Sequence, residues 1–229
     1  MARQNSSGQL NSKRGWPWVT TGLVCLQVYV FSCEKRAMQW GIINYLLDDF
    51  AFSWTHFLAN PFSQTPNLVS HTFLHANEAH IIGNLLFFLL FAPAVERTMG
   101  SLFFLVSYVF WGCVAALTQG FFSPFTSGLI GASGAISGAA GAFFVLYPLR
   151  MPVTFLAPVF GRIMAKIPAF FFIGLWFVGQ LHDGFQSLMP APFGAQITPI
   201  AHWAHIGGFA AGALTVVPFL FKNVQSSGT

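Results

Sequence analysis

Residues 101–149 read SLFFLVSYVFWGCVAALTQGFFSPFTSGLIGASGAISGAAGAFFVLYPL and contain no Asp, Glu, Lys or Arg. At ~1.5 Å of rise per residue, a helical run of this length crosses a ~30 Å hydrocarbon core twice. The rest of the chain is similar in character, since 55% of all residues are hydrophobic, 17% are aromatic and only 7% are charged. Such a composition cannot cover a water-facing surface, so the sequence predicts a membrane protein and excludes an ordinary soluble enzyme.

Apolar runs separated by turn residues predict six membrane-spanning helices, and hence an all-α, polytopic fold. The expected spans are Trp16–Cys33, Ala79–Val95, Leu102–Phe122, Gly131–Tyr147, Ile167–Met189 and Ala201–Phe221. The fourth is short, because the run from Ser133 to Tyr147 is only ~22 Å long as a helix. The first has a basic flank like a secretory signal but no small-residue cleavage site, so we expect a retained helix. The mixed segment from Glu34 to Glu78 is expected to lie in the outer interface without crossing the membrane.

The ten basic residues indicate the orientation of the chain. A net charge of +4 would suit nucleic acid, but the basic residues are scattered, so we expect no nucleic-acid partner. With a cytoplasmic amino terminus, only Lys35 and Arg36 lie outside, as the positive-inside rule favours. The other eight lie inside: Arg3, Lys13, Arg14, Arg97, Arg150, Arg162, Lys166 and Lys222. We therefore predict a disordered cytoplasmic tail at 1–15, a membrane domain at 16–222 and a second cytoplasmic tail at 223–229.

In this orientation spans two, four and six run the same way, so polar residues near their amino-terminal ends share the outer half of the membrane. These residues are His80, Asn84, Ser133, His202 and His205. Polar groups at that depth usually face a protein interior or an aqueous cavity, and they point to function.

The fourth and sixth predicted spans are rich in small residues, which permits close helix packing. Gly131 and Gly134 flank Ser133, and Gly208 follows His205 closely. Packing of these stretches would bring Ser133 within hydrogen-bond reach of His205. The alternative is that the small residues form a packing face with no chemistry.

A serine hydroxyl becomes a nucleophile when a base within ~2.6–3.2 Å accepts its proton, and histidine suits this work near neutral pH. We therefore assign Ser133 as nucleophile and His205 as base. The helix amino terminus at Ser133, together with His80 and Asn84 one turn apart on the second span, would supply donors for an oxyanion. Asp183 is the nearest carboxylate but lies near an outer helix end, so we expect a dyad and not a triad.

Two other kinds of site compete with this assignment. His71, His75 and His80 could suggest a metal site, but no cysteine or carboxylate completes the set and the spacing is not that of a zinc-protease helix. We predict neither a metal nor a cofactor. A small transporter would also hold polar residues in its spans, but the sequence has no paired inverted halves.

From Ser70 to Gly212 the chain resembles the rhomboid family of intramembrane serine proteases. The motifs that carry the resemblance are His71, His75, His80 and Asn84; Val95-Glu96 with Gly100; Gly131-Ala132-Ser133-Gly134; Ile167-Pro168-Ala169 with Trp176 and Gln180; and Ala204-His205-Ile206-Gly207-Gly208 with Gly212. The resemblance implies a six-helix bundle in which Ser133 attacks the scissile carbonyl and His205 acts as base and then acid. His80, Asn84 and the Ser133 amide would hold the oxyanion.

The resemblance also implies substrates that are single membrane-spanning helices, cut near the outer face, under a cap formed by His182–Ile200. A bacterial plasma membrane is the expected location. The alternative is an inactive relative that binds membrane helices without cutting them, but such relatives lose the serine or the histidine and this chain keeps both. One departure is Pro66-Asn67, where many members carry Trp-Arg, so the arginine expected to anchor the first loop is missing.

Overall fold

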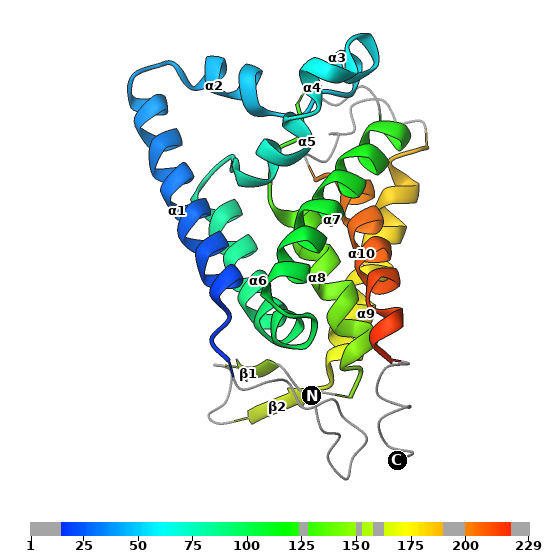
Figure 1. The fold of residues 1–229 in the computed structure, drawn as a ribbon. Coiled ribbons are helices and arrows are strands. Elements are labelled where there is room, and N and C mark those ends of the chain that lie inside the picture. Colours follow the sequence, from blue (N-terminus) through cyan, green and yellow to red (C-terminus); the bar gives the residue numbers. More distant parts are fainter. Residues whose placement is uncertain (1–14, 124–127, 150–152, 158–162, 190–199, 221–229) are drawn as a thin grey trace.

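The computed structural model describes residues 15–123, 128–149, 153–157, 163–189 and 200–220. Helices occur at all six positions where spans were predicted (Figure 1): α1 (Trp18–Gln39), α6 (Glu78–Met99), α7 (Ser101–Phe122), α8 (Ser133–Leu146), α9 (Ala169–Gln186) and α10 (His202–Thr215). Within the described residues, three helices are long and apolar enough to cross a membrane by length and composition: Glu78–Met99, Ser101–Phe122 and His202–Leu220. The predicted tails and most of the predicted cap fall at 1–14, 190–199 and 221–229, outside the described residues.

Helix α8 is the centre of the bundle. It packs against α6, α7, α9 and α10, and eleven of its 14 residues are buried, so it has almost no lipid-facing side. Its length is ~21 Å as a helix, whereas α6 and α7 have 22 residues each. Ser133, its first residue, therefore starts well inside the bundle.

Helices α8 and α10 touch through their backbones. A Cβ added at Gly208 would overlap the carbonyl oxygen of Gly134, and one added at Gly212 would overlap that of Gly138. Only residues without a side chain allow helices to approach this closely. The predicted small-residue packing is present, and it places the amino-terminal parts of α8 and α10 side by side.

The buried carboxylate of Glu96 joins three helices at the opposite end of the bundle. It accepts hydrogen bonds from the backbone amides of Val19 (3.0 Å) and Thr20 (2.8 Å) and from the Ser101 hydroxyl (2.7 Å). Because α1 has no side-chain cap of its own, this carboxylate supplies the acceptor that the first turn of a helix needs. Glu96 thus fixes α1 and the start of α7 to α6.

The first loop contains short helices only: α2 (Ile43–Phe50), α3 (Trp54–Ala59), α4 (Pro61–Gln64), α5 (Asn67–Ser70) and the 3₁₀ turn η1 (His71–Phe73). It lies across one end of the bundle (Figure 1). Large apolar side chains on it are exposed, including Tyr45 at 73% and Phe62 at 93%, as an interfacial position would require. The loop begins later than predicted, because α1 continues past Cys33 to Gln39.

A short hairpin, which the all-α prediction did not include, lies at the other end of the molecule (Figure 1). Strand β1 (Val153–Ala157) pairs with β2 (Ile163–Ile167) in antiparallel register, with Val153 opposite Ile167. Both strands contain branched and aromatic residues that favour extended backbone. The fifth span was predicted to begin at Ile167, but that residue ends β2 and α9 begins at Ala169.

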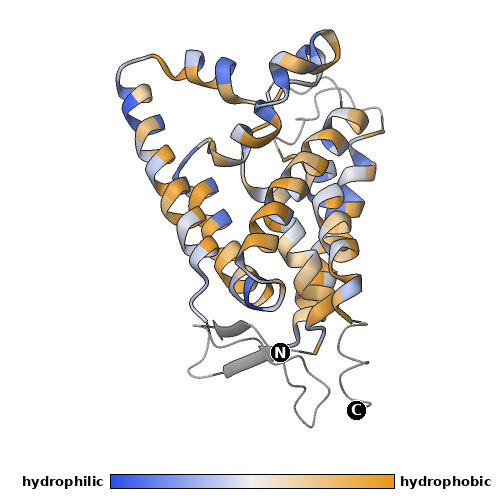
Figure 2. Cartoon of the chain, viewed as in Figure 1, coloured by the Kyte–Doolittle hydropathy of each residue, from blue (hydrophilic) through white to orange (hydrophobic). Residues whose placement is uncertain are grey.

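The outer surface of the bundle is apolar. Figure 2 shows hydrophobic residues along the helices of the bundle, and many of them are exposed, such as Leu86 at 62%, Leu102 at 77% and Leu175 at 76%. A water-soluble monomer rarely exposes apolar surface this extensively. The surface therefore fits a lipid environment.

Candidate active site

Ser133 is the first residue of α8, directly after a turn at Gly131 with φ = +120°. The Gly131 amide donates to the carbonyl of His71 (2.8 Å), and Leu129 pairs with Phe52 of the first loop in a two-bond β-bridge. A Cβ at Gly131 would lie 3.0 Å from Nε2 of His80 and 3.8 Å from Oγ of Ser133. Glycine is thus needed here for its φ and for the space between these two side chains.

His205 lies in the first turn of α10 and contacts Ser133 directly. Its Nε2 is 2.8 Å from Oγ of Ser133, so the contact predicted from small-residue packing is present. Its Nδ1 is 2.6 Å from Oε1 of Gln180 on α9, and its ring lies 5.9 Å from that of Trp176. Ser133 and His205 are both only partly buried.

His80 lies near Ser133 beside Gly131, and Asn84 follows it one turn later on α6. Nδ1 of His80 accepts a hydrogen bond from the Ala76 amide (3.4 Å), so in the neutral ring the proton is on Nε2, the nitrogen nearest Gly131. Asn84 is buried, and its Nδ2 has no hydrogen-bond partner among the described residues. A buried donor without a partner costs ~1–3 kcal/mol, so Asn84 is a candidate for a donor that acts on a ligand or a reacting group.

Comparison with known proteins identifies the family. The family model described as Rhomboid domain matches residues 62–222. The chain belongs to the rhomboid family. It is similar to rhomboid protease GlpG of Haemophilus influenzae (29% identical over 118 residues, 43% of this chain and 59% of that protein), to YdcA of Bacillus subtilis (34% over 83 residues, 36% and 42%) and to rhomboid-like protein 11, chloroplastic, of Arabidopsis thaliana (35% over 82 residues, 36% and 29%). The matches therefore span less than two thirds of each relative.

Family membership and the apolar helices together make this rhomboid a multi-pass integral membrane protein. The matched region contains all the predicted site residues, namely Ser133, His205, His80, Asn84, Gly131, Gly134 and Gly208. Among them, the structure brings the side chains of Ser133, His205 and His80 together beside the Gly131 turn.

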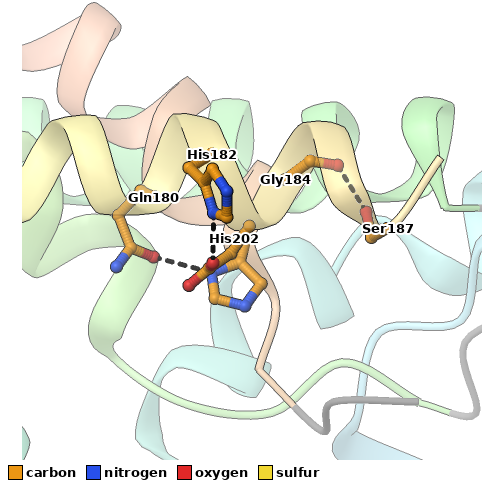
Figure 3. Close-up of polar contacts among 6 residues, drawn as sticks. Gln180, His182, Gly184, Ser187 and His202 are labelled. Atoms are coloured by element: carbon orange, nitrogen blue, oxygen red, sulfur yellow. Dashed lines mark hydrogen bonds and ion pairs between the residues drawn. The ribbon is translucent and has the colours of Figure 1, made fainter. Parts of the chain in front are cut away.

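The contacts of Asp183 and His202 can be compared with the expectations for them. Asp183 bonds Nδ1 of His182 (3.0 Å) at an exposed position, and no hydrogen bond joins it to His205 among the described contacts. His202, which the sequence placed among the polar residues of the outer half without a role of its own, is buried, and its Nδ1 is 3.0 Å from Oε1 of Gln180 (Figure 3). Gln180 is the polar residue whose contacts the sequence did not predict. An amide in the middle of an apolar helix was the signal that could have drawn attention to it.

The side chains of His71 and His75 bond to backbone carbonyls of their own segment. Nδ1 of His71 lies 2.9 Å from the carbonyl of Asn67, and Nδ1 of His75 lies 3.2 Å from that of Phe73. Burial lowers the pKa of each to about 4, with the neighbouring His80 also lowering that of His75. Both rings are therefore neutral donors at physiological pH. In the described part of the chain no three His, Cys, Asp or Glu side chains could hold a metal ion.

Asn67 takes over the anchoring of the first loop, which the missing family arginine had left open. The side chain is buried, and its Nδ2 donates to the carbonyls of Asp49 (3.0 Å) and Ala51 (2.9 Å). Phe52, the residue after Ala51, pairs with Leu129. The amide thus holds the part of the first loop that pairs with Leu129, four residues before Ser133.

Proposed function

We propose that this rhomboid is an intramembrane serine endopeptidase that cleaves single-span transmembrane proteins near the outer membrane face. In this proposal residues 16–222 form one membrane domain with six spans, both termini are cytoplasmic, and the membrane is a bacterial plasma membrane. The observation that carries the proposal is the 2.8 Å contact between Oγ of Ser133 and Nε2 of His205. A hydroxyl and an imidazole at this distance have the geometry of nucleophile and base.

The reaction follows from that contact. Oγ of Ser133 attacks the scissile carbonyl carbon while its proton moves to Nε2 of His205. His205 then gives the proton to the leaving nitrogen as the C–N bond breaks, and an ester to Ser133 remains. A water molecule, deprotonated by His205, hydrolyses this ester and regenerates the hydroxyl. A free alkoxide never forms on Ser133, because His205 accepts the proton while Oγ attacks.

The oxyanion that forms during attack would be held by three donors. These are the Ser133 amide at the start of α8, Nε2 of His80 and Nδ2 of Asn84. The amide is one of the free N–H groups at a helix amino terminus, where the dipole also favours negative charge. The missing partner of Asn84 Nδ2 supports this role, because a donor held ready for the transition state has no partner in the resting enzyme.

The test is cleavage of a synthetic single-span peptide by the purified protein in liposomes, together with labelling by a fluorophosphonate probe. Ser133→Ala and His205→Ala should each lower kcat/KM by at least ~10³-fold. Ser133→Ala should also abolish labelling. Ser107→Ala, which removes a buried hydroxyl from α7, and His56→Ala, which removes an exposed imidazole from α3, serve as matched controls with wild-type rates. Binding of the peptide without cleavage or labelling would favour an inactive rhomboid-like binder instead.

A further inference from the structure

The Gln180 side chain is shared by two imidazoles of α10. Its Oε1 lies 2.6 Å from Nδ1 of His205 and 3.0 Å from Nδ1 of His202. Figure 3 shows the amide of Gln180 reaching from α9 to the His202 ring. In the described residues no carboxylate takes this place, because Asp183 bonds His182 instead.

We propose that Gln180 is the positioning residue for His205, so that the site works as a Ser-His-Gln arrangement. This inference rests on the proposed function and deepens it. The carboxylate of a serine-protease triad holds the base in one tautomer and one orientation. Here a neutral amide oxygen does so, and it approaches the base from a helix that carries neither Ser133 nor His205.

The hydrogen bond determines which nitrogen of His205 is basic. An amide oxygen can only accept, so Nδ1 of His205 carries the proton when this bond forms. The lone pair is then on Nε2, which faces the Ser133 hydroxyl at 2.8 Å. If nothing held Nδ1–H, the ring could take the other tautomer, in which Nε2 is protonated and cannot accept the serine proton.

His202 fixes the amide in turn. An amide oxygen has two lone pairs, and the Nδ1–H groups of His202 and His205 use both. His202 is buried, so its own position is fixed by packing. Two donors converging on one atom favour the oxygen of Gln180 at that point and hold the side chain in a single rotamer.

The approach of α9 to α10 makes this contact possible. A Cβ at Gly184, one turn after Gln180, would lie 3.0 Å from Cδ1 of Ile206 and 3.7 Å from Cβ of His202. Glycine at this position lets α9 lie against the first turns of α10. Figure 3 shows Gly184 on the same helix as Gln180, above His202.

A neutral amide orients the imidazole but does not offset the charge that it gains. The titratable groups that face His205 are His202 on its own helix and His80 on α6, while α8 offers only the Ser133 hydroxyl. Asp183 acts on His202 and is bonded to His182. A carboxylate at position 180 would therefore be the first anion in direct contact with this ring.

The experiment compares Gln180→Leu, which removes the acceptor, with Gln180→Glu, which keeps an acceptor and adds charge. Gln180→Leu should lower kcat by ~10- to 100-fold with little change in KM, and it should slow fluorophosphonate labelling of Ser133 by the same factor. Gln180→Glu should regain most of kcat, and the acidic limb of its kcat/KM profile should move to higher pH, because an anion favours the protonated imidazole. Gln186→Leu makes the same exchange at an exposed position of α9 and should match the wild type.

Wild-type kcat in Gln180→Leu would overturn the inference. So would equal losses in Gln180→Leu and Gln180→Glu with an unmoved acidic limb, because a merely structural role predicts that result. Should Gln180→Leu unfold in detergent, the pH profile of Gln180→Glu decides alone. Both of these results require an active wild type. If the proposed function is wrong, the wild type itself shows no Ser133-dependent labelling.

Discussion

Asn84 is a buried amide whose Nδ2 has no hydrogen-bond partner among the described residues. It lies one turn after His80, whose Nε2 is next to the Gly131 turn. Natural proteins satisfy nearly all buried donors, and exceptions at active sites hold their donors ready for charge that appears only in the transition state. Asn84 should therefore stabilise the reaction more than it stabilises the fold.

Replacing Asn84 by Leu separates these two effects, since the side chains have similar volume. We expect kcat to fall by ~10²-fold because an oxyanion donor is lost. The thermal midpoint in detergent should stay the same or rise, because the variant no longer buries an unpaired donor worth ~1 kcal/mol or more. Kinetics on the single-span peptide and thermal unfolding measure both. A large loss of stability together with the loss of activity would mean that Asn84 has a structural role.

The first loop is connected to the active site by the Asn67 side chain and by two backbone contacts. Asn67 binds the carbonyls of residues 49 and 51, Phe52 pairs with Leu129, and the His71 carbonyl accepts from the Gly131 amide. Segments on both sides of Asn67 thus contact Leu129 and Gly131, which precede Ser133. The position of the nucleophile depends on this loop as well as on α8.

Asn67→Ala should loosen this connection. Two carbonyls, that of Ala51 buried and that of Asp49 partly buried, lose their donor. This should lower the free energy of unfolding by ~1–3 kcal/mol, and kcat should fall several-fold because Ser133 is less well placed. Asn60→Ala is the control in the same loop, since the Asn60 side chain is exposed and caps only the four-residue helix α4. Thermal unfolding and peptide cleavage of both variants provide the measurement. Equal effects at the two positions would contradict the anchoring role of Asn67.

The sequence was sufficient to predict the helices and the Ser133–His205 contact, because polar groups in apolar helices are rare and helix direction places them on one side. The small residues at Gly134 and Gly208 supplied the packing that brings them together. The partner of His205 could not be predicted in this way, since an amide such as Gln180 gives no sign of which neighbouring helix it faces. The β1–β2 hairpin was also missed, because short apolar segments fit a strand or a helix end equally well.

For the molecule as a whole, the number of membrane crossings decides where its two ends lie. In the part of the chain that the structure describes, length and composition select only α6, α7 and the helix His202–Leu220. Helices α1 and α9 are of similar length but contain charged residues near their carboxyl-terminal ends, such as Glu34 and Asp183. Three crossings would put the two ends of the chain on opposite sides, whereas six put them on the same side.

A reporter experiment distinguishes these arrangements. A reporter fused before Met1 and one fused after Lys222 should both be cytoplasmic if there are six crossings. The basic residues favour this result, since eight of the ten then lie inside. A third reporter inserted between β1 and α9, next to Lys166, should be cytoplasmic as well, and one placed in the first loop at Asn60 should be extracytoplasmic. Finding the terminal reporters on opposite sides would exclude the six-span arrangement, and with it the shared outer position of His80, Ser133 and His205 on which the choice of cleavage face depends.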